Sequence, residues 1–411
     1  MTRYLRERAL YPPLIPSPPA DDLGIVVVIP AKDEPDLLTS LACLLACDPP
    51  TRPAEVIVVV NTSETDAPET VAQNTSQAQQ ATRWATAHST PTLRFHILQQ
   101  HALPKKHAGV GLARKIGMDE ATRRLESVGN PGGIIACFDA DSTCDTNYLS
   151  ALEPCFQNDP KCQAASIYFE HPTSGNDHPP EIYHAITLYE LHLRYFIHAQ
   201  RHAGFPFAAQ SIGSSMAVRC DAYQQQNGMN RRKAGEDFYF LHKFTPLGHV
   251  AELTATRVIP SPRRSHRVPF GTGKAVNDIL ATEDPFTTYN LNSFHDLKAF
   301  FDRIPELYTA TSLPTGLPQS VATYLAKQPI EDRLSEIRNN STSQATFRTR
   351  FFRYFDAFQI MKFVHHARDH HHPNTRITPT AATLLNAPEN ASPKALLESY
   401  RHQARAETRS T

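Results

Sequence analysis

Two carboxylates that follow an apolar run are the residues of this chain with the clearest chemical meaning. The run at residues 134–138 is followed at once by Asp139 and Asp141, with Ala140 between them. Short apolar runs rich in β-branched residues are typical of buried strands. Ligands bind at the carboxyl ends of strands in open α/β sheets, and paired carboxylates there suit Mg²⁺ or Mn²⁺ that also contacts phosphate. The alternative is a strand that ends in a solvated acidic turn.

Polar side chains also follow the three earlier apolar runs. The first run ends before an acidic pair, the second before an amide and the third ahead of a loop with a basic pair. Because the carboxyl ends of parallel strands meet at one edge of a sheet, we expect these side chains to line one crevice. They are Asp33 and Glu34 after residues 23–29, Asn61 after residues 55–60, and Lys105 and Lys106 after residues 93–98.

The elements that must position these side chains alternate between strand and helix. Apolar spacing and helix-opening glycines predict helices between the apolar runs. Four such alternations in the first 150 residues predict an α/β fold with a doubly wound, mainly parallel sheet and flanking helices. The predicted strands are 23–29, 55–60, 93–98 and 134–138, and the predicted helices are 36–47, 66–88, 109–126 and 147–156.

The rest of the chain divides into segments of different character. Residues 1–22 contain five prolines, which predicts an extended Pro-rich N-terminal arm. Residues 23–274 should form the α/β domain, with its first half ending near residue 145. Residues 275–411 match no pattern of that domain and should form a mainly helical C-terminal extension. The second half of the domain should hold strands at 164–170 and 249–258 and helices at 181–202 and 235–244.

Composition excludes several classes of protein. Lys plus Arg and Asp plus Glu each number 41, so no net charge attracts nucleic acid. The seven cysteines are odd in number and form no C-x-x-C pair, which favours reduced thiols over a disulfide framework or structural zinc. No apolar stretch approaches the roughly 18 residues of a membrane-spanning helix. The N-terminus lacks the apolar core of a signal peptide, so we expect a cytoplasmic protein.

Five motifs in a fixed order resemble the family 2 glycosyltransferases, which have the GT-A nucleotide-sugar fold. VVVIPAKDE (26–34) resembles the opening strand and loop of the family, with Asp33 where Asn is usual. EVIVVVNTSETD (55–66) resembles the second strand, with Val60 and Asn61 in place of paired acids. The other three are GVGLARKIGMDEA (109–121), FDADST (138–143), which resembles the metal-binding D-x-D, and the acceptor-side NGMNRRKAGEDFYFLHKF (227–244).

The resemblance implies an inverting, hexosyltransferase-like enzyme that moves a sugar from a nucleotide-diphosphate sugar to an acceptor hydroxyl. Asp139 and Asp141 would hold Mn²⁺ or Mg²⁺ on the diphosphate, with His266 as third ligand and His249 as its rival. Asp237 would be the general base, and Glu236 would bind the acceptor or orient a neighbour. The donor would also contact Pro30, Ala31, Asp33, Glu34, Asn61, Lys106, Arg114, Asp139, Ala140 and Arg267.

Several of these roles have structural alternatives. Acids at a helix start, such as Glu236 and Asp237, are favourable for the helix dipole alone. Gly109 and Gly111 suit either the approach of backbone amides to phosphate or close helix packing. Arg114 could serve as a structural ion pair, whereas Arg263 or Arg267 could hold phosphate bidentately.

Two other functions and one other location are compatible with the sequence. D-x-D-x-[ST] after a strand also resembles haloacid-dehalogenase-type phosphatases, with Asp139 as nucleophile, although three strands precede it here. The second alternative is a catalytically inactive glycosyltransferase-like assembly protein.

Aromatic and basic residues interleave at 347–362, which favours a core helix over peripheral contact with the inner face of a membrane. The nucleotide base, the sugar, the oligomeric state and the acceptor, whether glycan, lipid or small molecule, stay open.

Overall fold

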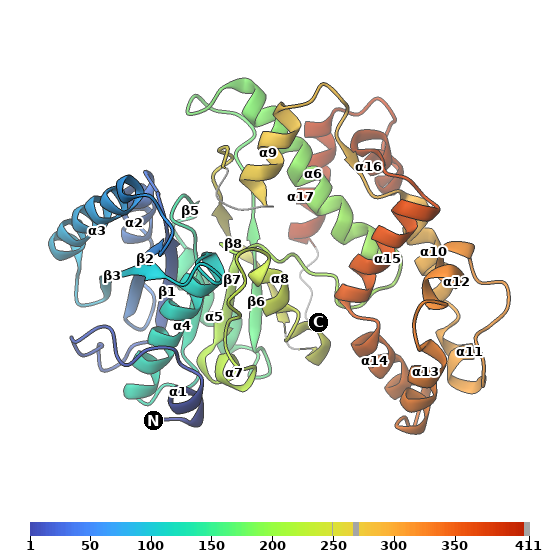
Figure 1. The fold of residues 1–411 in the computed structure, drawn as a ribbon, viewed down its shortest axis with the longest axis horizontal. Helices are drawn as coiled ribbons and strands as arrows, with labels where there is room; N and C mark the ends of the chain where they lie inside the picture. Colours follow the sequence, from blue (N-terminus) through green and yellow to red (C-terminus); the bar gives the residue numbers. More distant parts are fainter. Residues whose placement is uncertain (249, 266–270, 407–411) are drawn as a thin grey trace. The chain divides into compact units, whose positions relative to one another are not determined.

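The computed structural model of the protein describes residues 1–248, 250–265 and 271–406 and contains an eight-stranded mixed sheet (Figure 1). The strand order is β3-β2-β1-β4-β7-β6-β8-β5, and every strand except β5 and β7 runs in the same direction. The strands are β1 (Ile25–Ala31), β2 (Ala54–Ser63), β3 (Leu93–Leu103), β4 (Ile134–Cys137), β5 (Thr143–Cys144), β6 (Ala164–Phe169), β7 (Met216–Arg219) and β8 (Val250–Ile259).

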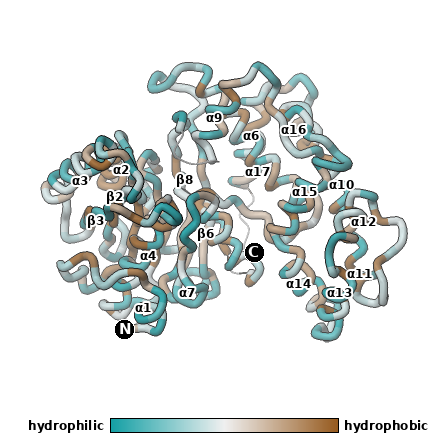
Figure 2. The backbone as a smooth tube through the Cα atoms, viewed as in Figure 1, coloured by the Kyte–Doolittle hydropathy of each residue, from teal (hydrophilic) through white to brown (hydrophobic). Residues whose placement is uncertain are grey.

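The central strands are apolar because they are covered on both faces. Val26, Val27 and Val28 of β1 are all fully buried, so consecutive side chains find packing partners on opposite sides of the sheet. Figure 2 shows brown, apolar stretches of the tube around β2, between α3 and α4. The four predicted strands of the first 150 residues and their parallel order are confirmed.

Helices on both faces complete this part of the fold. Right-handed crossovers place α2 and α3 on one face of β1–β3 and α4 on the other (Figure 1). Gly117 lets α4 approach the sheet, because a Cβ there would lie 2.5 Å from Cγ1 of Val28. The helices are α2 (Leu37–Leu45), α3 (Pro68–His88), α4 (Val110–Ser127), α5 (Tyr148–Gln157), α7 (Cys220–Gln225) and α8 (Glu236–Leu241), with a 3₁₀ turn at Thr245–Leu247.

The N-terminal arm differs from the extended conformation expected of a Pro-rich segment. It begins with a short helix, α1 (Arg3–Glu7), in which the Thr2 hydroxyl accepts a hydrogen bond from the Leu5 amide. The five prolines all lie beyond this helix, so they do not prevent it. The arm is bound along α4: the Tyr4 hydroxyl donates to Asp119 at 2.6 Å, and the Ile15 amide donates to Glu120 at 3.2 Å.

The chain divides into two compact units. The first comprises residues 1–182, 211–277 and 404–411, and the second residues 183–210 and 278–403. The second unit is helical, as expected for the C-terminal part. Its chain holds α6 (Pro180–His202), α9 (Thr272–Leu280), α10 (Leu291–Phe301), α11 (Ile304–Thr309), α12 (Gln319–Leu325), α13 (Ile330–Asn339), α14 (Gln344–Tyr354), α15 (Ala357–His370), α16 (Ile377–Leu385), α17 (Pro393–Ala406), and the short strands β9 (Thr287–Thr288) and β10 (Thr375–Arg376), with α6, α9 and α17 crossing a unit boundary.

The aromatic and basic segment of the second unit has the burial pattern of a core helix. Phe347 and Phe351 of α14 are fully buried, whereas Arg350 and Arg353 are exposed. Within residues 1–248, 250–265 and 271–406, no helix has both the length and the apolar character needed to cross a membrane.

Replacing Gly117 by Ala should destabilise the first unit. The new Cβ would overlap Val28 and lie 3.1 Å from Cγ2 of Val59, so α4 and the sheet must separate. We expect a net loss of about 1–2 kcal/mol in the free energy of unfolding, even after the roughly 1 kcal/mol gain in helix propensity. Urea denaturation measures this. Gly132→Ala is the control, since its Cβ would meet its nearest atom at 3.5 Å; equal midpoints for the two variants would contradict the packing.

Candidate functional site

The loop after β1 is held at the edge of the sheet by side chains of α3. Asp33 has a φ of 53°, a left-handed conformation that Asn and Asp tolerate better than other side chains, so Asp can replace the more usual Asn. The Asp33 amide donates to Asn74 at 2.9 Å, and the Gln73 amide nitrogen donates to the Asp33 carboxylate at 2.7 Å. The Glu34 amide donates to Gln77 at 3.2 Å. These bonds fix the direction in which the loop presents Glu34.

Arg263 joins this loop to the D-x-D turn. It lies in the segment that follows β8, and its Nε donates to Asp141 at 2.9 Å while its Nη2 donates to Glu34. The three side chains are largely buried, which strengthens charge interactions over those at a surface. Glu34, Asp141 and Arg263 therefore come from three distant parts of the chain and meet at one guanidinium.

Arg114 makes a second and more deeply buried bridge. Its side chain is only 2% exposed, and it donates to Asp139 at 2.5 Å and to Glu236. Gly213 lies against this guanidinium, because a Cβ at that position would be 2.5 Å from both terminal nitrogens of Arg114. The D-x-D turn and the acids of α8 are thus coupled through one side chain of α4.

Glu236 and Asp237 open α8 and share the surroundings of Arg114. Gly235 precedes them with a φ of 68°, and the Asn230 side chain donates to the Glu236 carbonyl at 2.9 Å, which fixes the start of the helix. Burial raises the pKa of Glu236 to about 7, with Arg114 opposing this and Asp237 adding to it. Burial also raises the pKa of Asp237, again against the effect of Arg114. Three carboxylates around one cation favour retention of a proton near neutral pH.

The other predicted donor contacts lie at the same edge of the sheet or beyond it. Pro30 and Ala31 end β1, and Asn61 is buried near the end of β2. Ala140 is buried in the D-x-D turn. Lys106 is exposed in the segment after β3. Two predicted residues, His266 and Arg267, and the rival ligand His249 lie outside the described residues.

The glycines at the start of α4 serve close packing. A Cβ on Gly111 would lie 2.4 Å from the carbonyl oxygen of Arg232, and one on Gly109 would lie 2.8 Å from Cα of Lys233. The Gly111 amide donates to the Arg232 carbonyl at 3.2 Å. Of the two interpretations, the structure supports packing, here against the segment before α8 instead of the sheet.

The acidic side chains do not form a ready-made cage for a metal ion. Over the ranges 1–248, 250–265 and 271–406, no group of three or more His, Cys, Asp or Glu side chains could hold one. Asp139 and Asp141 instead accept hydrogen bonds from Arg114 and Arg263. The two carboxylates still fit an ion such as Mg²⁺ that takes its other ligands from water and substrate phosphates.

Sequence reasoning missed the residues that support the site from α3 and from residue 213. Gln73, Asn74 and Gln77 of α3 reach the loop after β1. Their helical spacing places Asn74 and Gln77 on one face, which is the signal that could have indicated this role. Gly213 could be recognised only once Arg114 was seen to lie against it.

Residues 26–225 match the sequence profile described as Glycosyl transferase family 2. These residues form a family 2 glycosyltransferase domain. The predicted α/β class, with a mainly parallel sheet, flanking helices and a helical C-terminal part, is confirmed. No curated protein matches the chain.

Two solved structures of S. aureus TarS 1–349 resemble this fold. The complex with UDP-GlcNAc has 12% sequence identity and a TM-score of 0.39, and the similarity covers 81% of this chain and 91% of that one. The complex with UDP has 12% sequence identity and a TM-score of 0.38. The similarity covers 81% of this chain and 90% of that one.

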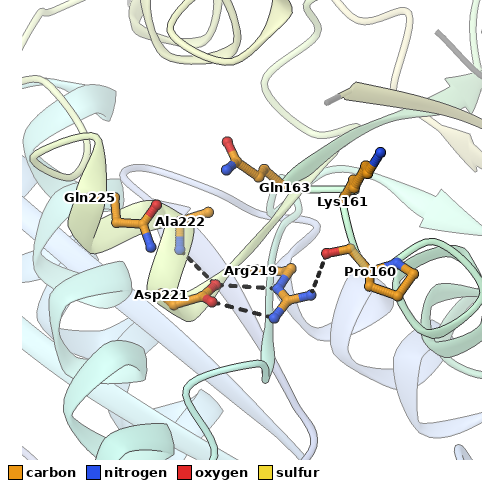
Figure 3. A pocket seen from close by; sticks show the side chains of 7 residues that line it. All are labelled: Pro160, Lys161, Gln163, Arg219, Asp221, Ala222 and Gln225. Atoms are coloured by element: carbon orange, nitrogen blue, oxygen red, sulfur yellow. Dashed lines mark hydrogen bonds and ion pairs between the residues drawn. The ribbon is translucent and has the colours of Figure 1, made fainter. Parts of the chain in front are cut away.

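A small pocket lies at the opposite end of the family 2 domain's sheet (Figure 3). Arg219 ends β7 and pairs with Ile134 at the start of β4, so the pocket is remote from the carboxyl end that carries Asp139. The Arg219 guanidinium donates to Asp221 at 3.2 Å and to the Pro160 carbonyl at 3.2 Å. The positive charge of Arg219 is therefore compensated within the pocket. The pocket therefore gives no reason to move the candidate site away from the D-x-D edge.

The raised pKa of Glu236 predicts a specific pH dependence of stability. The folded protein holds this proton more tightly than the unfolded chain, in which the pKa is near 4.5. The resulting stabilisation is complete below about pH 4.5 and is lost as the pH rises through 7; it amounts to about 3 kcal/mol. Glu236→Gln should remove this part of the slope, as measured by urea denaturation between pH 4.5 and 8. The exposed Glu69→Gln is the control, and a Glu236→Gln curve parallel to wild type would refute the assignment.

Proposed function

We propose that the protein is an inverting glycosyltransferase that moves a sugar from a nucleotide-diphosphate sugar to an acceptor hydroxyl. The observation that carries this proposal is the Arg114 bridge between Asp139 and Glu236. Asp139 belongs to the motif that serves the leaving group, and Glu236 adjoins Asp237, the candidate base. A glycosyl transfer needs both groups close to one anomeric carbon, and this arginine couples them.

The donor would lie along the carboxyl ends of β1, β2 and β4. Asp33, Glu34 and Asn61 would contact the nucleoside, since carboxylate and amide groups can pair with base edges and ribose hydroxyls. Pro30, Ala31 and Ala140 would form the adjoining walls. Arg263, Arg267 and Lys106 would contact the diphosphate, for which guanidinium forks and an ammonium group are suited.

Asp139 and Asp141 would hold a divalent ion, Mn²⁺ or Mg²⁺, with the diphosphate. When bound, such an ion neutralises charge that gathers on the departing nucleoside diphosphate. Asp141 has to exchange its contact with Arg263 for this role. The same exchange would release Arg263 toward the phosphate oxygens, because its positive charge then lacks one of its two carboxylate partners.

Asp237 would act as the general base. Its carboxylate would take the proton from the acceptor hydroxyl while that oxygen forms a bond to the anomeric carbon. The bond from that carbon to the diphosphate oxygen breaks on the opposite face, which inverts the configuration. A raised pKa makes Asp237 a stronger base than an ordinary aspartate. Glu236 is held by Arg114 and would position the acceptor beside it.

Asp237→Asn tests the base directly. We expect kcat to fall at least about 100-fold, since an amide cannot accept the proton, while donor binding persists. Sugar transfer is measured on a panel of acceptors, and donor binding by thermal shift. Asp221→Asn, at the far end of the sheet, is the matched control and should keep its activity (Figure 3). Full activity of Asp237→Asn would refute the role of this residue.

Donor binding is tested separately from turnover. UDP-, GDP- and dTDP-sugars are screened by thermal shift with Mn²⁺, and the screen is repeated on Asp141→Ala. At a ligand concentration of 100 Kd, wild type should gain about 2.7 kcal/mol. The gain should vanish without the metal and in the variant. An unchanged shift in Asp141→Ala would contradict the metal-bridged donor site.

The alternatives predict other outcomes. An inactive assembly protein would show no transfer or donor hydrolysis with any sugar, while still binding a partner. A phosphatase that uses Asp139 would form an aspartyl-phosphate that beryllium fluoride mimics, and Asp139 would have to leave Arg114 for this.

We place the enzyme in the cytoplasm, with contact to the inner face of a membrane as a further proposal to be tested by vesicle sedimentation.

A further inference from the structure

Three cysteine sulfurs lie in contact beside the D-x-D turn. Cys43 lies in α2, Cys47 follows two residues after the end of that helix, and Cys144 is the last residue of β5. The Cys144 sulfur is 3.7 Å from the Cys43 sulfur and 3.7 Å from the Cys47 sulfur. All three side chains are partly exposed, in contrast to Cys137, Cys162 and Cys220, which are buried. The fold therefore gathers three accessible thiols from segments about a hundred residues apart.

The surroundings of these thiols favour reaction at Cys43. The Cys144 amide donates a hydrogen bond to the Cys43 sulfur at 3.2 Å. The Cys43 and Cys144 thiols also share a hydrogen bond. The Cys144 hydrogen bond lowers the pKa of Cys43 to about 6, although burial opposes this. Burial raises the pKa of the Cys220 thiol, which makes it a poor nucleophile. A thiolate with a neighbouring thiol in contact is the arrangement of a thiol that oxidises and is then resolved.

The same thiols adjoin the chain that forms the candidate site. Cys144 lies three residues after Asp141, and the Ser40 hydroxyl of α2 donates to the Ser142 carbonyl at 2.7 Å. α2 itself begins three residues after Glu34. A covalent link between Cys144 and α2 would therefore join the two segments that carry Glu34 and Asp141.

We propose that Cys43, Cys47 and Cys144 form a redox-modification site in which Cys144 forms a disulfide with Cys43 or Cys47. The oxidant is a hydroperoxide. The Cys43 thiolate attacks the terminal peroxide oxygen, the O–O bond breaks and an alcohol or water leaves, which gives a sulfenic acid. The Cys144 sulfur then attacks the Cys43 sulfur, and water leaves as the S–S bond forms. Two thiols lose two hydrogens, the peroxide is reduced, and a dithiol reductant reverses the change.

Peptide mapping of the full-length protein tests the linkage. After treatment with dilute hydrogen peroxide and alkylation of the remaining thiols, we expect the peptide that contains Cys43 and Cys47 to be joined to the one that contains Cys144. The intact mass should fall by about 2 Da for this disulfide and recover with dithiothreitol. Cys144→Ser should abolish the link. Cys155→Ser is the matched control, since Cys155 precedes the next Lys and shares the tryptic peptide of Cys144.

One further variant and a melting measurement separate the proposal from simple thiol packing. Cys43→Ser should slow formation of the link at least about 10-fold and leave only a Cys47–Cys144 disulfide, because the more acidic thiol is lost. The disulfide closes a loop of roughly 100 residues, so the oxidised protein should melt at least about 3 °C above the reduced one. Retention of all three free thiols at peroxide levels that oxidise a small-molecule thiol would overturn the proposal. An identical cross-link in Cys144→Ser would do the same.

Discussion

The buried guanidinium of Arg114 is the interaction on which the candidate site depends. A charge with 2% exposure is tolerated in a protein interior only when carboxylates compensate it, and here Asp139 and Glu236 do so from distant parts of the chain. Removal of either partner would leave a buried charge without full compensation, at a cost of about 3–5 kcal/mol. The position of α8 relative to the D-x-D turn is therefore set by electrostatics as much as by the packing of apolar side chains. Gly213 is part of this arrangement, because any side chain there would displace the guanidinium.

The charge around Arg114 and Arg263 explains why a ligand of this site would have to bring a cation with it. Arg114 faces Asp139, Glu236 and Asp237, and Arg263 faces Glu34 and Asp141, so carboxylates outnumber guanidinium groups. The elevated pKa of Glu236 is one response, since a retained proton reduces the excess of negative charge. A diphosphate would add further negative charge at the same edge. Under the proposed function, a divalent ion at Asp139 and Asp141 would offset this charge, and Asp139 is the more exposed of the two, at 36% against 20% for Asp141.

Much of this arrangement could be predicted from the sequence, and the limits are physical. Strands such as β1 and β4 are apolar runs bounded by turn residues, and their order fixes which polar side chains share an edge. The D-x-D turn and Glu236 could be recognised because motif residues keep their spacing. The partners of those acids could not, since Arg263 lies far along the chain from Glu34 and no local pattern relates the two. The α1 helix was missed because the Pro-rich composition belongs to the residues after it, whereas its own start is capped by the Thr2 hydroxyl.

The N-terminal arm completes the restraint on Arg114. α4 packs on the sheet through Gly117 and is covered on its other side by residues 1–22, so even its charged Lys115, Asp119 and Glu120 are buried. The arm satisfies those charges: Tyr4 bonds Asp119 and receives a hydrogen bond from Lys115 at 2.8 Å, and the Leu14 and Ile15 amides bond Glu120. Loss of the arm would expose these groups and free one face of the helix. Because Arg114 directly precedes Lys115 of this network on the same helix, residues outside the matched 26–225 segment help to hold the guanidinium between Asp139 and Glu236.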